Sequence, residues 1–159
     1  MYKVVIIDDE PIIVEGIFRL VPWGKYQCCV SACAYSGREG LEVIKREKPD
    51  IIFSDISMPG LDGLKMIAAL KSEFPDMQIS ILTGYRDFDY CQEALRLGVT
   101  RFLLKPSKLT ELEEALSVMA DNLKERHIYP GDAEHEENVA GCFIVKMLFN
   151  IWRIITVKN

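Results

Sequence analysis

The sequence lacks cysteine pairs at the spacings that metal sites and redox motifs use. Its five cysteines are odd in number, with no CxxC pair and no His/Cys grouping at zinc-ligand spacing. These absences argue against a structural zinc site and against thiol redox chemistry. Cys28, Cys29 and Cys33 fall in a predicted strand, where free cysteine acts as a small apolar residue.

A targeting segment, an internal repeat and a low-complexity tract are also missing. An apolar strand pattern begins at Tyr2, with no basic and then apolar leader before it. We therefore expect the chain to reside in the reducing cytoplasm.

Acidic residues outnumber basic ones outside the last 21 residues of the 159-residue chain. The net charge is −5, but Lys146, Arg153 and Lys158 are the charged residues of 139–159, so the first 138 residues carry −8. A segment with this much negative charge repels the phosphate backbone of nucleic acids. This argues against direct nucleic-acid binding by this chain. The length suits one domain with a proper core.

Short apolar runs alternate with amphipathic segments along the chain. Five strands separated by helices predict a parallel sheet covered on both faces. Right-handed crossovers then favour strand order 2-1-3-4-5, and the fold class is a flavodoxin-like (βα)5 doubly wound sheet with a C-terminal helical tail. The expected strands are 2–7, 28–34, 50–54, 77–82 and 101–104, and the expected helices are 11–21, 37–47, 62–73, 86–97 and 108–125.

Capping residues agree with several of these helix ends. Ser36 and Asp62 are suited to N-caps, and Gly98 is suited to a C-terminal cap. Thr110 and Glu113 have the spacing of a capping box at the start of the last helix.

Three acids, a hydroxyl and a lysine stand at the ends of predicted strands. Asp8 and Asp9 follow the first strand, Asp55 the third, Thr83 the fourth and Lys105 the fifth. Ligands bind beyond the carboxyl ends of the strands in such sheets. Each residue alone would be a turn former, a cap or a solvated charge. Their joint placement instead predicts a site for a divalent metal and a phosphoryl group.

The predicted site has a definite chemistry. Asp9 and Asp55 are the expected direct ligands of Mg²⁺ (or Mn²⁺), Asp8 is expected to act through water, and the backbone carbonyl of Ser57 could add a neutral ligand. Asp55 is also suited to attack a phosphoryl donor, since carboxylates form aspartyl-phosphates. The metal and Lys105 would neutralise charge on the transferring group, and Thr83 could donate to a phosphoryl oxygen.

Two further residues leave alternatives open. A cis bond before Pro106 would turn the chain sharply and direct Lys105 into the site, but only about 5–6% of X–Pro bonds are cis. Phe102 can be read as plain core packing. If it faces the outer edge near the helix at 86–97, its ring could move inward when Thr83 shifts toward a phosphate.

Four motifs together resemble the receiver domain of bacterial two-component response regulators. They occur in family order and are Val4–Pro11, Asp55–Gly63, Leu82–Gly84 and Phe102–Pro106. The resemblance covers residues 1–127 and implies a phosphoacceptor signalling protein. Such a protein is not expected to be an enzyme, since the only reaction it performs is removal of its own phosphoryl group.

The resemblance implies a role for each matching position. Asp55 would be the phosphoacceptor, phosphorylated by a sensor histidine kinase, and Asp8 and Asp9 would be the acidic pair that holds magnesium. Thr83 and Phe102 would be the switch pair. Lys105 would contact the phosphate, and its bond to Pro106 is usually cis in the family. The fourth helix, fifth strand and fifth helix would form the signalling and dimerisation face.

The segment Gly84–Tyr90 and the loop at Trp23 are similar to receivers that precede AraC-type DNA-binding domains. Such proteins carry about a hundred further residues with two helix-turn-helix units, which this sequence lacks. A truncated transcriptional response regulator is therefore one alternative.

Two other classes fit less well. A metal-dependent phosphohydrolase with an aspartyl-phosphate typically spaces its two aspartates two residues apart, whereas Asp8 and Asp9 are adjacent. A flavodoxin-like cofactor binder would need a Ser/Thr/Gly-rich phosphate loop after the first strand, and an acidic pair stands there instead.

Residues beyond the receiver pattern divide into two segments. Residues 128–138 are acidic, contain Pro130 and Gly131, and predict a solvated linker. In a helix over 139–159, Lys146, Asn150 and Arg153 would form one polar stripe on an otherwise apolar surface. Packing on the receiver or on a second subunit is expected, and two central cations argue against a membrane span.

Overall fold

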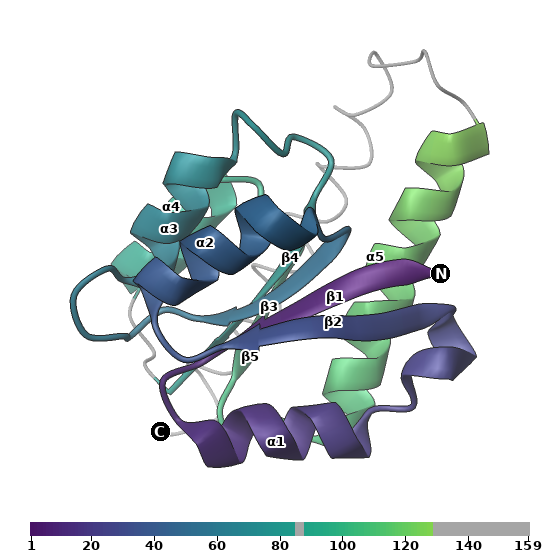
Figure 1. Cartoon of the computed structure of the whole chain (residues 1–159), viewed down its shortest axis with the longest axis horizontal. Coiled ribbons are helices and arrows are strands. Elements are labelled where there is room, and N and C mark those ends of the chain that lie inside the picture. Colours follow the sequence, from purple (N-terminus) through teal and green to yellow (C-terminus); the bar gives the residue numbers. More distant parts are fainter. Residues whose placement is uncertain (85–87, 129–159) are drawn as a thin grey trace. The chain divides into compact units, whose positions relative to one another are not determined.

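Five parallel strands form one sheet in the order β2-β1-β3-β4-β5, which confirms the predicted topology. The computed structural model describes residues 1–84 and 88–128 (Figure 1). The strands are β1 (Tyr2–Ile7), β2 (Cys28–Ala34), β3 (Ile51–Asp55), β4 (Gln78–Thr83) and β5 (Arg101–Leu104).

Helices cover both faces of this sheet, as Figure 1 shows. One face carries α2 (Gly37–Glu47), α3 (Gly63–Leu70) and α4 (Phe88–Arg96), and the other carries α1 (Pro11–Leu20) and α5 (Leu109–Ile128). A short 3₁₀ helix, η1 (Trp23–Tyr26), lies between α1 and β2.

Strand β1 shows why these residues form a doubly covered sheet. Val5 and Ile7 pack with the α2, α3 and α4 side, whereas Val4 and Ile6 pack with the α1 and α5 side. All four are at most 1% exposed. Because side chains alternate across a strand, a continuous apolar run supplies two cores at once.

Several predicted caps are present. The Ser36 hydroxyl accepts a hydrogen bond from the Glu39 amide, and the Asp62 carboxylate accepts one from the Lys65 amide. Gly98 has a φ of 69°, a left-handed conformation that suits glycine after a helix.

The capping box at Thr110 and Glu113 is wrong. The α5 helix starts at Leu109, and the Glu111 carboxylate accepts from the amide of Lys108, one residue before the helix. Glu113 instead lies 2.9 Å from the Tyr26 hydroxyl and 3.0 Å from the Lys25 ammonium of η1. A tertiary contact thus uses the carboxylate that the local pattern assigned to the cap.

Other boundaries differ by a few residues, as hydrogen-bonded ends usually do. Strands β3 and β4 each start and end one residue later than predicted, so Asp55 and Thr83 are the last residues of their strands. The α3 helix ends at Leu70, three residues early, and α5 continues to Ile128.

The four described cysteines, Cys28, Cys29, Cys33 and Cys91, are free thiols. Burial raises the pKa of the Cys28 thiol to about 11 and also raises the pKa of Cys33. A raised pKa keeps a thiol neutral and unreactive, in agreement with a packing role. Cys142 lies outside the described residues.

The contacts of the chain divide into two units, Met1–Lys124 and Glu125–Asn159. The described part of the second unit is the end of α5. The linker predicted at 128–138 and the tail predicted at 139–159 lie outside the described residues, apart from Ile128.

Candidate functional site

The carboxyl ends of four neighbouring strands bring the predicted site residues together. Asp8 directly follows β1, Asp55 ends β3, Thr83 ends β4, and Lys105 directly follows β5. Because these strands are parallel and adjacent in the sheet, residues far apart in the sequence meet at one edge.

Three carboxylates form an acidic cluster at this edge. One oxygen from each of Asp8, Asp9 and Asp55 lies within 4.8 Å of the others. Asp8 is 2% exposed and Asp55 is 4% exposed, while Asp9 is half-buried. Burying several like charges is costly without a cation, so the cluster requires a positive partner.

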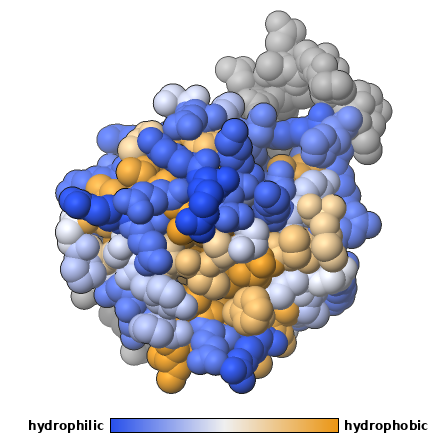
Figure 2. Space-filling view, viewed as in Figure 1, coloured by the Kyte–Doolittle hydropathy of each residue, from blue (hydrophilic) through white to orange (hydrophobic). Residues whose placement is uncertain are grey.

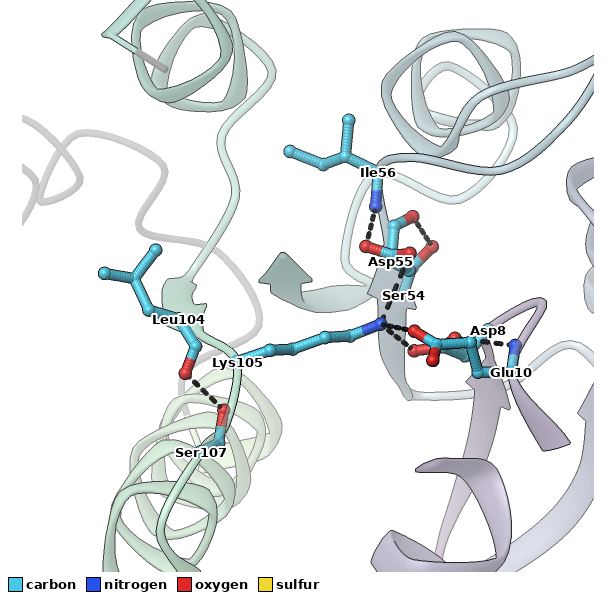
Figure 3. Close-up of polar contacts among 8 residues, drawn as sticks. All are labelled: Asp8, Glu10, Ser54, Asp55, Ile56, Leu104, Lys105 and Ser107. Carbon is cyan, nitrogen blue, oxygen red and sulfur yellow. Dashed lines mark hydrogen bonds and ion pairs between the residues drawn. The ribbon is translucent and has the colours of Figure 1, made fainter. Parts of the chain in front are cut away.

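Lys105 supplies positive charge to the cluster (Figure 3). Its Nζ lies 2.6 Å from Asp8 Oδ2 and 3.3 Å from Asp55 Oδ2. It also lies 3.4 Å from Oε1 of Glu10, a residue that the sequence did not single out. The Lys105 side chain is 14% exposed, so the ammonium is largely shielded from solvent.

Burial and charge set the protonation of this group of residues. Burial raises the pKa of Asp55, and the neighbouring Asp8 raises it further, while Lys105 and the Ile56 amide lower it in part. Burial lowers the pKa of Lys105, but its contacts with Asp8 and Asp55 outweigh burial and raise it. Lys105 therefore stays charged at neutral pH.

Backbone groups fix the orientation of the buried acids. The Ile56 amide donates to Asp55 Oδ1 at 2.8 Å, and the Glu10 amide donates to Asp8 Oδ1 at 2.9 Å. The other oxygens, Asp8 Oδ2 and Asp55 Oδ2, face the ammonium of Lys105 (Figure 3). In each carboxylate, a backbone amide thus holds one oxygen, and the other oxygen faces Lys105.

Gly63 is a second residue whose importance sequence reasoning missed. A Cβ at this position would lie 1.9 Å from the Asp55 carbonyl oxygen. The Gly63 amide also donates to the Ile56 carbonyl at 2.9 Å. Only a residue without a side chain lets the start of α3 approach the strand that carries Asp55. The available signal was the glycine directly after the N-cap Asp62.

The remaining predicted residues lie on β4 and β5 or shortly after β3 and β5. Thr83 is fully buried, and its carbonyl accepts from the Lys105 amide at 2.9 Å. Phe102 is half-buried against the core on the α2, α3 and α4 side. The Lys105–Pro106 peptide bond is cis. The Ser57 side chain is exposed, two residues after Asp55.

The donors of the cluster fit a hard divalent cation. The candidate metal group within residues 1–84 and 88–128 consists of carboxylates, the ligands that Mg²⁺ and Mn²⁺ prefer. Asp8 Oδ2 is buried and accepts no hydrogen bond of good geometry from those residues, although it is ion-paired with Lys105. A buried anionic oxygen of this kind is suited to bind a cation or its water shell.

Comparison with known proteins identifies the family. The model of the response regulator receiver domain matches residues 4–117, so the chain belongs to this family of signalling phosphoacceptor domains. The chain is 37% identical over 134 residues to the transcriptional regulatory protein HptR of Staphylococcus aureus. That alignment covers 82% of this chain and 51% of HptR.

Solved structures agree with this assignment. The chain is 38% identical to the REC domain of AraT, a response regulator from Geobacillus stearothermophilus, with a TM-score of 0.76. That match covers 79% of this chain and 98% of the other. The isolated REC domain of RcsB from Salmonella enterica serovar Typhimurium, determined with the phosphomimetic BeF₃⁻, is 25% identical with a TM-score of 0.68. It covers 76% of this chain and 88% of that one.

The chain spans about half the length of the curated relatives that it matches, including 51% of HptR. Within the described residues, every helix is too short or too polar to cross a bilayer.

Proposed function

We propose that this chain is the phosphoacceptor of a two-component phosphorelay and that Asp55 receives the phosphoryl group from a sensor histidine kinase. One observation carries the proposal: Asp55 is buried in an acidic cluster with a lysine ammonium 3.3 Å away. A carboxylate in this setting is oriented by the backbone and faces a charge that can neutralise an incoming phosphoryl group.

The transfer is a displacement at phosphorus. A carboxylate oxygen of Asp55 attacks the phosphorus of a phosphohistidine, and the new P–O bond forms as the P–N bond breaks. The imidazole leaves with the electron pair of that bond and takes up a proton. The Lys105 ammonium then faces the added negative charge, so the protein contributes mainly positioning and electrostatics.

The acidic cluster is the proposed site of Mg²⁺, or of Mn²⁺ in its place. Asp9 and Asp55 would be direct ligands, Asp8 would act through water, and the Ser57 carbonyl would add a neutral oxygen. When bound, the metal neutralises charge on the transferring phosphoryl oxygens. The carboxylate donors and the buried Asp8 oxygen support this assignment.

The proposed output is a switch of the face formed by α4, β5 and α5. Phosphorylation would draw the Thr83 hydroxyl toward the phosphate, and Phe102 would turn inward into the space that becomes available. Phe102 is only half-buried, so its ring has room to change its packing. Phe88 of α4 and Leu109 of α5 are 61% and 39% exposed, which suits a surface that binds a partner or a second copy.

The kinase must reach the acidic cluster, and α1 begins next to it. Ile12, Phe18 and Leu20 of α1 are between 49% and 77% exposed. Figure 2 shows apolar surface along its lower edge, where α1 lies in Figure 1. An apolar helix beside the phosphoacceptor supports a docking role for α1.

Phosphate uptake from a small phosphodonor tests the assignment of Asp55. With Mg²⁺ present, wild type should become labelled and Asp55→Asn should not. Asp121→Asn is a matched control, because Asp121 is an exposed acid on α5 that pairs with Lys124. Equal labelling of wild type and the well-folded Asp55→Asn protein would refute the proposal.

A role in transcription is a second proposal, supported by the name and length of the HptR relative. The receiver would act in the cytoplasm and control a DNA-binding segment, either in a longer form of this protein or on a partner. The acidic receiver itself should not bind DNA, and binding to duplex DNA at physiological salt would contradict this expectation. Sedimentation with and without BeF₃⁻ would show whether activation promotes dimerisation.

A further inference from the structure

Glu10 occupies a helix-capping position but does not cap the helix. It is the N-cap of α1, with Pro11 at the start of the helix, and its side chain makes no capping hydrogen bond. Glutamate is not among the preferred N-caps, which are Ser, Thr, Asp and Asn. The Glu10 carboxylate instead accepts a hydrogen bond from Lys105 Nζ at 3.4 Å (Figure 3).

Three carboxylates lie around the ammonium of Lys105. An ammonium carries three N–H donors. Oxygens of Asp8, Glu10 and Asp55 lie at 2.6, 3.4 and 3.3 Å from Nζ. The contact with Glu10 has hydrogen-bond geometry, whereas the contacts with Asp8 and Asp55 are ion pairs. A phosphoryl oxygen on Asp55 must therefore compete with these carboxylates for the ammonium.

The three carboxylates differ in how firmly they are held. The side chains of Asp8 and Asp55 are 2% and 6% exposed, and each receives a backbone hydrogen bond on its other oxygen. The Glu10 side chain is 59% exposed and is the most distant of the three. Water can solvate the Glu10 carboxylate after it leaves the lysine, whereas the buried acids have no such replacement.

We propose that Glu10 is a positioning residue that competes with the phosphoryl group for Lys105. This inference rests on the function proposed above. In the unphosphorylated protein, Glu10 accepts a hydrogen bond from Lys105, and an incoming phosphoryl group competes with Glu10 for that donor. Glu10 thereby lowers the affinity of the site for a phosphoryl group and slows its arrival.

The structure also sets the size of the expected effect. Exposed ion pairs contribute little free energy, so loss of the Glu10 contact should tighten binding of a phosphate mimic by about two- to fivefold. The test is to titrate BeF₃⁻ at saturating Mg²⁺ and measure its apparent Kd in wild type and Glu10→Gln. The initial rate of phosphorylation by acetyl phosphate should rise in parallel.

Glu15 provides a matched control on the same helix. Its side chain is also 59% exposed and is ion-paired, but with Arg19. Glu15→Gln removes the same charge without touching Lys105, so it should leave the Kd for BeF₃⁻ unchanged. An equal gain of affinity in Glu10→Gln and Glu15→Gln would overturn the proposal, because net charge would then explain both.

A double-mutant cycle with Lys105→Ala separates competition for the lysine from simple repulsion of an anion. When Lys105 is absent, Glu10→Gln should no longer improve binding of BeF₃⁻. A gain that persists in the Lys105→Ala background would refute the lysine contact as the cause. If wild type is labelled at Asp55 while Glu10→Gln shows no gain, this inference fails and the proposed function stands.

Discussion

Replacing Gly63 by alanine should disrupt both the fold and the site through one contact. The added Cβ would lie 1.9 Å from the carbonyl oxygen of Asp55 and 3.0 Å from its carbonyl carbon. Cβ atoms essentially never approach another heavy atom within 3.0 Å. Either α3 or the end of β3 must therefore move by at least about 1 Å, and both are backbone segments without flexible ends.

Overpacking of this kind usually destabilises a protein by about 1–3 kcal/mol. We expect a loss of about 3 kcal/mol here, because the clash involves the backbone on both sides. That is a large part of the roughly 5–15 kcal/mol that stabilises a typical domain. With a typical slope of about 1–3 kcal/mol per M, the urea midpoint should fall by about 1–3 M. The displaced Asp55 should also accept phosphate more slowly under conditions in which the variant is still folded.

Urea unfolding followed by circular dichroism measures the loss of stability, and labelling from acetyl phosphate measures the rate at which Asp55 accepts phosphate. Gly16→Ala is the control, since a Cβ at Gly16 in α1 meets nothing within 4 Å. That change should stabilise the protein by about 0.5–1 kcal/mol, because alanine favours a helix over glycine. A Gly63→Ala protein as stable as wild type would refute the close approach of α3 to Asp55.

Two further predictions concern buried groups away from the site. The Cys28 thiol is 1% exposed, with a pKa raised from its usual 9.0 to about 11. Because folding favours the neutral thiol, burial of Cys28 adds to the free energy of unfolding. This addition is complete below about pH 9 and is lost as the pH rises toward 11. The free energy of unfolding should fall by about 2–3 kcal/mol more in wild type than in Cys28→Ala over that range, and equal losses would contradict the argument. The Ser80 hydroxyl is fully buried and has no hydrogen-bond partner among the described residues. Ser80→Ala should therefore leave stability unchanged or raise it by up to about 1 kcal/mol, and a loss above that amount in urea unfolding would imply a missed partner.

Local pattern was sufficient to predict most of the fold. Apolar runs and capping residues such as Ser36 and Asp62 depend on neighbouring residues, and the structure confirms them. The capping box predicted at Thr110 and Glu113 is absent because the Glu113 carboxylate contacts η1, which is distant in sequence. A local rule cannot detect a stronger partner that only folding brings near.

The sequence by itself determined the alternation of strands and helices, and with it the edge of the sheet at which Asp8, Asp9, Asp55 and Lys105 gather. These features follow from side-chain periodicity and from the rule that parallel strands end at a common edge. Only the tertiary structure decided that Glu10 accepts a hydrogen bond from Lys105 and that Gly63 lets α3 approach Asp55. Both are contacts between segments whose spacing depends on how helices pack on the sheet, a quantity that no short stretch of sequence encodes.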